Sequence, residues 1–515
     1  MRKKRQFIKL LSITLFNSIT VFMPYTFVYA DAPITTQAQV DALDLLNGNV
    51  MHQSTGTNLY NVKADEALNF VGNGTNTIAF TAGTVDNKIN HTYTTVVSSS
   101  QAIDFNDFEA MDIQAHVIKG ALDESCGGLS AEYGGAINVN ASVKKLIIDL
   151  TDTNIGTLVE ARTGSKNAVS TIKLDSSQIQ LSNGTDTNNA VIVSNGYEAD
   201  KVASYINIGS DNQYVNSLTI DGGKNSNGQV KGAGIGVMGK YYGQVNIYGN
   251  NIDITAGTPL SAYGSGMITV YAGSGTEQGL VIKPDINTGW GIGIWSQYNN
   301  SLVQVLSGNV TIDGGTWGTY AGNGRYGAGD IKLGTTNQKL DKVSIRTSDY
   351  GMESYGGNNL IYANQIDIQA PYAVLTIAQT TDYTGLSNNV EIHGDSKTTI
   401  IGDIYNQSGV VNVNNLPNDG SMEMTGNIYT GVSSGAYATN KCITEIGVQG
   451  KNSYVTGIVQ DKSENAATTL YLNNGGVWNV TGNSNLDTLK LDTGGVVNLT
   501  QNTEYQHVTA KNMTG

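Results

Sequence analysis

Cysteine, proline and charge are all scarce in this chain. Its 515 residues include two cysteines and six prolines, and only 14% of them are charged. Two cysteines cannot build a disulfide framework of the kind that holds small secreted domains together. Acidic residues outnumber basic ones, 43 to 29, and such a chain repels phosphate backbones and anionic lipid. Nucleic acid is therefore not expected as a partner.

The residues of strands and turns, by contrast, are abundant. There are 62 glycines, and 27 tyrosines against 8 phenylalanines, so most of the aromatic rings of these two types carry a hydroxyl group that tolerates water. Glycine and asparagine favour tight turns, whereas tyrosine, threonine and valine favour strands. The composition predicts many short strands joined by turns rather than long helices.

The first thirty residues have a composition of their own. Five basic residues stand before position 10, and an apolar run extends from Leu10 to about Met23. Val28 and Ala30 occupy the −3 and −1 positions of a small-residue cleavage site, which predicts a secretory signal peptide cut between Ala30 and Asp31. A retained membrane anchor is the weaker interpretation, because the apolar run is short and interrupted by polar residues. The exported chain would lose only those five basic residues and keep 24 basic against 43 acidic ones, which favours solubility.

A ten-residue pattern, apolar-x-apolar-x4-apolar-x-apolar, recurs through the middle of the chain. It occurs at Ile172–Leu181, Val245–Ile254 and Val303–Ile312, and more loosely at Asn359–Ile368, with starts 73, 58 and 56 residues apart. Each copy alternates apolar and polar residues, as a strand with one buried face does. Since such short strands cannot bury that face alone, they need to stack on equivalent strands of the next repeat.

Stacked repeats of this kind predict an all-β fold, a right-handed parallel β-helix whose coils lie about 4.8 Å apart. Glycine and asparagine at the corners would form the turns, and asparagines at matching corners would hydrogen-bond along the axis. We expect coils of about 20–25 residues, roughly twenty in all. Cys126 and Cys442 would then lie far beyond the Cα separation of about 7 Å that a disulfide permits.

The two ends of the predicted rod differ from its middle. From Thr35 the sequence predicts a short amphipathic helix with Val40, Leu43 and Leu46 on its apolar face and Gly48 as its stop. Such a helix would cover the first edge of the stack, which otherwise invites pairing with other strands. We divide the chain into a signal peptide (1–30), an N-terminal cap region with the first coils (31–120), the repeated β-helix (121–398) and the C-terminal coils (399–515).

The C-terminal coils contain the segment VWNVTGNSNLDTLKLDTGGVVNL at 477–499. Its Trp-x-Val-Thr-Gly-x-Ser-x-Leu-x-x-Leu pattern is formed by Trp478, Gly482, Ser484, Leu486 and Leu489. This pattern closely resembles the end of the passenger domain of bacterial autotransporters, the pertactin-like type V secretion proteins. In that family a C-terminal β-barrel inserts in the outer membrane, and the passenger folds outside as a β-helix. The resemblance implies a folding-promoting module here, and a location at the cell surface or outside a diderm bacterium.

The family's translocator barrel does not follow in this sequence. Such a barrel needs many alternating strands with aromatic girdles, and the printed chain stops at Gly515. We expect either that the sequence is cut from a longer protein or that the passenger has lost or separated from its translocator, and the first alternative is favoured. The barrel is then an expected partner.

No motif for a cofactor, a metal ion or a nucleophile stands out. Gly431–Gly435 matches Gly-x-Ser-x-Gly, but no convincing helix follows it, as a nucleophile elbow requires, so it is interpreted as a turn between coils. Metal-binding spacings such as His-Glu-x-x-His are absent. The histidines are scattered singly: His52, His91, His116, His393 and His507.

A polysaccharide lyase or hydrolase is the main enzymatic alternative, because such enzymes resemble this fold and place acids with Lys and Arg along one groove. Solvated corner residues are the simpler interpretation, since paired-carboxylate catalysis needs a fixed spacing that sequence alone does not show. The candidate residues are Asp313, Asp330, Asp349 and Glu353, with Arg325 and Arg346 nearby.

Three of the four tryptophans fall in one short region together with several tyrosines. Exposed rings on neighbouring coils would form a strip able to grip sugar rings or a protein partner. The alternative is that Trp290 and Trp295 lie inside the coils in an aromatic stack. The residues of the predicted strip are Trp290, Trp295, Tyr298, Trp317, Tyr320 and Tyr326.

Together these features favour a non-enzymatic surface passenger that acts as an extended adhesin or self-association rod through many weak contacts. Its partner would be a protein or glycan on a host or neighbouring cell, or a second copy of the chain, and no cofactor is expected. The alternative is a secreted β-helical carbohydrate-active enzyme. A β-helix hosts unrelated activities, so the fold alone does not decide between them.

Overall fold

The computed structural model describes most of the chain from residue 34 onward. The predicted signal peptide with its cleavage site at Ala30 and Asp31, and the strip residue Tyr326, lie outside the described residues. These comprise 34–43, 50–53, 62–63, 66–82, 96–115, 126–151, 157–164, 168–183, 190–222, 234–276, 278–285, 290–298, 300–322, 327–377, 388–434, 438–500 and 506–515.

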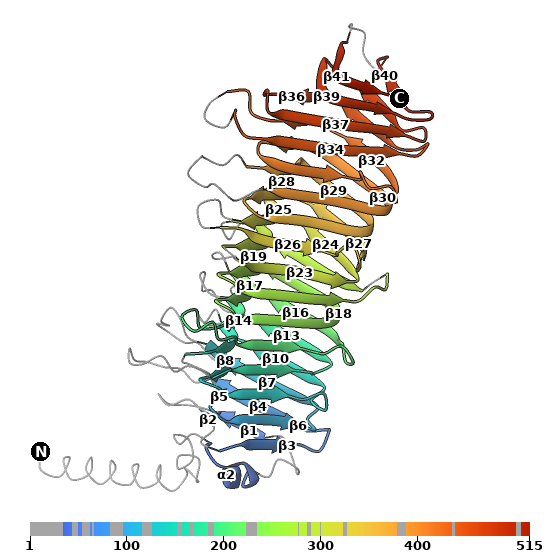
Figure 1. The fold of residues 1–515 in the computed structure, drawn as a ribbon. Coiled ribbons are helices and arrows are strands. Elements are labelled where there is room, and N and C mark those ends of the chain that lie inside the picture. The colour runs from blue at the N-terminus through green and yellow to red at the C-terminus, as the bar shows by residue number, and fades with distance from the viewer. Residues whose placement is uncertain are drawn as a thin grey trace, which may run out of the picture.

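The described strands form one elongated stack, with the N-terminal strands at one end and the C-terminal strands at the other (Figure 1). The chain passes repeatedly through three sheet faces, here called A, B and C, before it reaches the next coil. Strands that follow one another on a face pair in parallel, as β10 does with β7 and β13. The prediction of an all-β, parallel β-helix-like fold is therefore confirmed. Within the described part of the chain, no helix has the length and apolar character to span a membrane.

Most strands belong to a single face. Face A contains β1 (Val50–Gln53), β4 (Thr77–Ala82), β7 (Ala110–Ala115), β10 (Lys145–Asp149), β13 (Gln178–Ser182), β16 (Val215–Asp221), β21 (Gly279–Pro284), β24 (Asn309–Asp313), β27 (Leu340–Arg346), β32 (Ser421–Thr425), β35 (Tyr454–Gly457), β38 (Val477–Val480) and β40 (Val496–Asn498). Face B contains β2 (Val62–Lys63), β5 (Val96–Ser99), β8 (Cys126–Glu132), β11 (Thr157–Arg162), β14 (Ala190–Asn195), β17 (Ile235–Lys240), β19 (Thr258–Tyr263), β22 (Ile292–Gln297), β25 (Trp317–Gly322), β28 (Tyr350–Tyr355), β33 (Ile428–Thr430) and β36 (Val459–Asp461). Face C contains β3 (Leu68–Val71), β6 (Ala102–Asn106), β9 (Ala136–Val139), β12 (Thr171–Leu174), β15 (Tyr205–Ile208), β20 (Met267–Ala272), β23 (Ser301–Ser307), β26 (Gly329–Leu333), β31 (Gly409–Val413), β34 (Cys442–Gln449) and β37 (Ala466–Asn473).

Five longer strands turn a corner and contribute to more than one face. β18 (Gln244–Ala256) runs from face C into face A, and β39 (Ser484–Leu491) and β41 (Val508–Thr514) run from face B into face C. β29 (Asn358–Thr376) and β30 (Asn389–Asn406) pass through all three faces. In these two coils the corners are made without an interrupting loop.

The sequence repeat corresponds to two coils. Ile172, Val245, Val303 and Asn359 occupy the same register position on face C, and the intervening strands β15, β20 and β26 separate them. Most coils are longer than the expected 20–25 residues, because the chain between strands is long at several corners. Ile179 pairs with Leu218, 39 residues later. The described strands accordingly make fewer coils than the twenty expected.

The interior is built from ladders of apolar side chains. Met111, Leu146, Ile179 and Leu218 follow one another in register on face A, and none is more than 2% exposed. Each such side chain contributes roughly 1.5–3 kcal/mol by leaving water. The outward residues between them stay in contact with solvent, so the inward and outward rows are set by the strand period.

Polar ladders form at the corners, as predicted for asparagine. Asn140 donates from Nδ2 to Asn106 Oδ1 (2.8 Å), and Asn106 donates in turn to Asn69 Oδ1 (2.8 Å). Cys442 is a free, buried thiol, and its strand β34 lies many coils from β8, which begins at Cys126. The segment 431–434 is an irregular connection between β33 and β34, consistent with a turn rather than a nucleophile elbow.

The predicted helix near residue 35 is present but short. Helix α2 (Gln37–Asp41) starts at Thr36, whose side chain forms a capping box with Gln39, and Val40 is buried. The helix lies at the N-terminal end of the stack, beside β3 (Figure 1). The predicted positions Leu46 and Gly48 lie outside the described residues.

The tryptophan motif near the C-terminus forms the core of the last coils. Trp478 is fully buried, pairs with Val455 and Val497, and donates from Nε1 to the carbonyl of Gly457 (3.1 Å). Ser484 is also buried, and its hydroxyl donates to the carbonyl of Gly482 (3.1 Å). The buried leucines Leu486 and Leu489 complete this core.

Candidate binding surface

Outward-facing aromatic residues gather on neighbouring coils of face B. In the first outward row Trp317 pairs with Tyr350, and Tyr350 with Tyr372. In the second row Trp295 pairs with Tyr320. Both rows lie on strands whose apolar residues, such as Ile294, point inward. The register of the coils therefore brings together rings that are up to eighty residues apart in sequence.

The rings form one continuous stack, here called the aromatic ladder. The Trp295 and Tyr320 rings are nearly parallel, with centroids 5.8 Å apart. Tyr320 stacks on Trp317 at 6.4 Å, Trp317 on Tyr350 at 5.5 Å, and Tyr350 on Tyr372 at 5.4 Å. Trp290 extends the stack, 6.1 Å from Trp295 and tilted by 44°. The ladder comprises Trp290, Trp295, Trp317, Tyr320, Tyr350 and Tyr372.

The ladder lies on the outside of the coils. Trp290 is 56% exposed and Tyr372 is 41% exposed, while the rings between them are partly exposed. The alternative interpretation, in which Trp290 and Trp295 lie in an interior stack, is wrong. Because the middle rings cover one another's faces, the surface presents mainly ring edges to solvent. Open ring faces, which a sugar ring needs for stacking, are confined to the two ends.

A buried carboxylate lies next to the ladder, in its second row. Glu353 follows Tyr320 in the second row and is 4% exposed. Trp317 donates from its indole Nε1 to Glu353 Oε2 (2.8 Å). Burial raises the pKa of the Glu353 carboxyl to about 7, although the Trp317 hydrogen bond opposes the shift. Burial, and then the nearby Glu353 carboxylate, raise the pKa of the Tyr320 hydroxyl.

Tyr298, which the sequence placed in the same strip, belongs to a separate ladder at the corner between faces B and C. Its ring lies 4.5 Å from that of Tyr263, which lies 5.4 Å from that of Tyr241. The ammonium group of Lys240 stands over both Tyr241 and Tyr263, at 4.9 and 5.9 Å. The predicted strip is therefore two surfaces, of which Tyr298 belongs to the smaller.

The candidate acids of the enzymatic alternative are spread over the three faces. Asp313 ends β24 on face A and Asp349 lies in the turn before β28, whereas Glu353 is on face B. Asp330 is on face C and accepts a hydrogen bond from the Asn358 side chain (2.8 Å). Arg346 forms an ion pair with Asp367 (3.2 Å), and Arg325 lies outside the described residues. Asp313 and Arg346 are register partners on face A and line one shallow hollow, but Asp330 and Glu353 lie on the other two faces.

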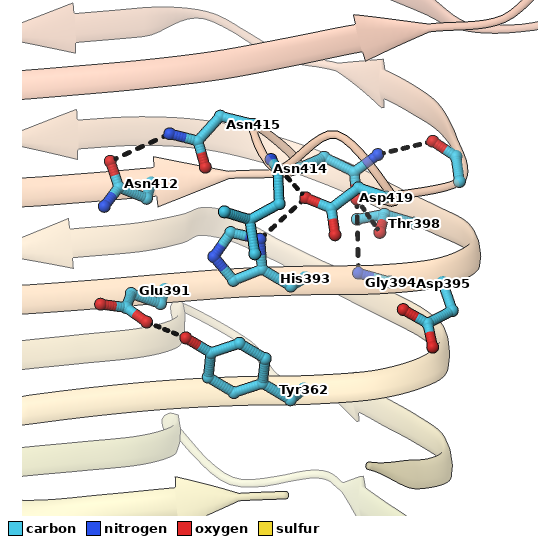
Figure 2. A network of polar contacts seen from close by, with 12 residues as sticks. Tyr362, Glu391, His393, Gly394, Asp395, Thr398, Asn412, Asn414, Asn415 and Asp419 are labelled. Atoms are coloured by element: carbon cyan, nitrogen blue, oxygen red, sulfur yellow. Dashed lines mark hydrogen bonds and ion pairs between the residues drawn. The ribbon is translucent and has the colours of Figure 1, made fainter. Parts of the chain in front are cut away.

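A polar network is buried where face C turns into face A. His393 Nδ1 lies 2.8 Å from Asp419 Oδ2, and both side chains are at most 3% exposed. The same carboxylate oxygen accepts the backbone N–H of Leu416 (2.8 Å). Figure 2 shows His393 on one coil and Asp419 in the segment that follows Asn414 on the next. The pair therefore ties the segment between β31 and β32 to the coil below.

The rest of this network satisfies neighbouring polar groups. Tyr362 stacks on His393 with centroids 5.0 Å apart, and its hydroxyl donates to Glu391 (Figure 2). Asn414 accepts from the Thr398 hydroxyl (2.9 Å) and donates to the carbonyl of Gly420 (2.8 Å). Because most of its members are buried and each contacts another member, the network is a structural element of the corner. Among the described residues, this corner included, no group of three or more His, Cys, Asp or Glu is placed to hold a metal ion.

Sequence reasoning missed Tyr350, Tyr372 and the burial of Glu353. The aromatic residues themselves were visible, but their alignment depends on the lengths of the corners between strands. A signal that could have found them is the spacing from Trp317 to Tyr350, which equals the spacing from Val310 to Val343 on the neighbouring face.

Comparison of the chain with protein-family models, curated protein sequences and solved structures finds no match. The function is therefore inferred from the surface itself.

Proposed function

We propose that this protein is a rigid adhesive rod that binds a protein partner on another cell through the aromatic ladder of face B. The continuous stack of six rings on the outside of the coils carries this proposal. Aromatic side chains are enriched at the cores of protein interfaces, and tryptophan and tyrosine dominate their energetics.

The geometry of the rings favours a protein over a glycan as the ligand of the ladder. Stacked rings expose edges and little open face, and edges pack well against aliphatic side chains. The rings are also held by their neighbours on adjacent coils, so little side-chain freedom remains to be lost on binding. Self-association is the less favoured alternative, because the exported chain would carry 43 acidic against 24 basic residues and two such rods repel each other.

The proposal includes a place for the protein in the cell. The resemblance of 477–499 to autotransporter passengers, together with the predicted signal peptide, supports export and display at the surface of a diderm bacterium. In this context the rod would be a right-handed β-helix, with α2 as a cap on its first coil and Trp478 in its folding-promoting module. A secreted carbohydrate-active enzyme remains the second candidate function.

The experiment is adhesion of beads coated with the purified chain to intact cells. We expect the double variant Trp290→Ala/Tyr372→Ala to reduce adhesion about tenfold, because these are the most exposed rings of the ladder. Tyr133→Ala is the matched control, since Tyr133 is a 47% exposed aromatic residue outside the ladder. Pretreating the cells with protease should abolish adhesion, whereas periodate oxidation of their glycans should not.

Equal adhesion of the double variant and the Tyr133→Ala control would contradict the proposal. Adhesion lost after periodate treatment would replace the protein partner with a glycan. Sedimentation of the free chain tests self-association, and turnover of a polysaccharide panel tests the enzymatic alternative.

A further inference from the structure

A groove is hollowed into face A. It has a volume of about 750 Å³ and extends across successive strands from β16 to β29. Six strand positions spaced about 4.8 Å apart give it a length of roughly 24 Å along the rod axis. On face A, β16, β18, β21, β24, β27 and β29 pair in this order, in the middle part of the stack in Figure 1. The aromatic ladder is on another face, so the groove is a separate feature.

A missing side chain hollows the floor of the groove. The first row of outward side chains would form an unbroken ridge, but Gly279 leaves a gap in it. The backbone of Gly279 has φ = +142°, a conformation that other residues rarely adopt. A Cβ at Gly279 would lie 2.8 Å from the carbonyl oxygen of Asn309. Next to it, Val281 forms an apolar patch on the floor. The first row comprises Ser217, Asn251, Gly279, Asn309, Lys342 and Gln365.

One wall of the groove is held in place from the next coil. Asn309 donates from Nδ2 to the carbonyls of Gly275 (3.0 Å) and Gln278 (3.1 Å). Gln278 also donates its backbone N–H to the Gly275 carbonyl (3.0 Å). These bonds hold Gly275 and Gln278 in place beside the floor of the groove.

The described residues of the lining are mostly polar, and their charges nearly balance. Its titratable residues are Asp253, Asp341 and Lys342, and Asp253 is already paired with Lys283 (2.5 Å). The other polar groups are amides and hydroxyls, which donate and accept hydrogen bonds without charge. In a chain with an excess of acidic residues, this chemistry suits a neutral ligand that is rich in hydroxyl groups.

The regular spacing of equivalent residues along the groove indicates that its ligand is a polymer. Each coil presents one residue of each outward row, so equivalent groups recur about every 4.8 Å along the axis. An extended peptide repeats about every 3.3 Å and falls out of step with the coils. A sugar ring in an extended chain is about as long as one coil is high, so successive rings can meet equivalent groups.

We propose that the face A groove binds a neutral polysaccharide that lies along the rod axis, with its rings over Val281 and its hydroxyls bonded to the amides of Asn251 and Gln365. This site is independent of the protein-binding ladder.

The test is calorimetric titration of the full chain with neutral hexasaccharides: maltohexaose, cellohexaose, mannohexaose and chitohexaose. At least one should bind, and its disaccharide should bind at least tenfold more weakly, because the groove spans several coils. Thr311→Tyr places a ring on the floor and should weaken binding at least tenfold. Thr399→Tyr is the matched control, because Thr399 occupies the same outward row beyond the groove.

Gln365→Ala is a second variant, which removes an amide at the rim of the groove instead of adding a side chain to its floor. It should weaken hexasaccharide binding severalfold with an unchanged circular dichroism spectrum. Absence of binding by all four hexasaccharides would overturn the proposal. So would equal affinities of the Thr311→Tyr and Thr399→Tyr variants. Tighter binding of a polygalacturonate hexamer or of an extended Ser-Asn peptide would also overturn it, since the ligand would then be charged or a peptide.

Discussion

Faces A and B of the same coils carry opposite surface chemistries. On face B the outward positions hold stacked rings and a buried carboxylate, whereas on face A they hold amides, hydroxyls and a glycine. Both rest on the same kind of inward ladder of isoleucine, valine and leucine. The backbone period fixes which residues point outward and leaves their chemistry free. A β-helix can therefore carry different binding surfaces on one rod without changing its core.

The two faces also differ in how buried polar groups are held. The corner that leads into face A buries His393 against Asp419, with a backbone N–H as a second donor. Face B buries Glu353 with a single hydrogen bond from the neutral indole of Trp317 among the described contacts. Substitutions at these positions should therefore have effects of opposite sign.

The largest effect is expected at the corner of face A. His393→Ala leaves the buried Asp419 carboxylate without its side-chain partner, which should lower the free energy of unfolding by about 3 kcal/mol or more. Urea denaturation measures this change. Asp419→Ala and the double variant complete a double-mutant cycle. A coupling energy near zero between His393 and Asp419 would mean that this pair does not stabilise the corner.

On face B, Glu353→Gln should stabilise the protein at high pH. The folded pKa of Glu353 is about 7 against 4.5 for a free carboxyl, so the folded state holds a proton that the unfolded state releases. The contribution of Glu353 to the free energy of unfolding is complete below pH 4.5 and is lost as pH rises to about 7. The loss amounts to about 3 kcal/mol at most. The variant should match the parent chain at pH 4 and exceed it at pH 8.

Thermal unfolding across this pH range measures the difference. Asp253→Asn on face A is the matched control, because Asp253 is exposed and ion-paired with Lys283, and surface pairs contribute less than about 1 kcal/mol. If Glu353→Gln and Asp253→Asn gave the same pH profile, Glu353 would not be titrating in a buried site.

A smaller effect is expected at the floor of the groove. Gly279→Ala forces a Cβ toward the Asn309 carbonyl at φ = +142°, which should cost about 1–3 kcal/mol. The same change raises the floor, so hexasaccharide affinity should fall as well. Gly74→Ala is the control, because Gly74 also has a positive φ but lies in open surroundings away from the groove. It introduces backbone strain without filling the groove. Equal hexasaccharide affinities in the two variants would contradict the account.

The sequence was sufficient to predict the stacked architecture, because alternation and a long repeat are local signals. Ile172, Val245 and Val303 were recognised as equivalent, and they do share one register position. Coil length was less predictable, since the number of residues between successive strands, as between Asp221 and Ile235, follows no regular pattern in the sequence. The estimate of coil number was too high for this reason.

The candidate surface was predicted only in part for the same physical reason. Trp290, Trp295, Trp317 and Tyr320 are close in sequence and do lie together, but Tyr298 projects from a different corner. Glu353 was counted among solvated acids, although its place next to Tyr320 on the following coil buries it. Burial of an outward residue depends on the size of its neighbours on adjacent coils, which only the register reveals.

The measurement that tests the separation of the two surfaces most directly is the affinity of the Trp290→Ala/Tyr372→Ala variant for the hexasaccharide that binds the parent chain. We predict an unchanged affinity, together with the roughly tenfold loss of cell adhesion. A parallel loss of hexasaccharide affinity would show that the ladder, and not the groove, holds the sugar, and would contradict the account of one rod with two independent binding faces.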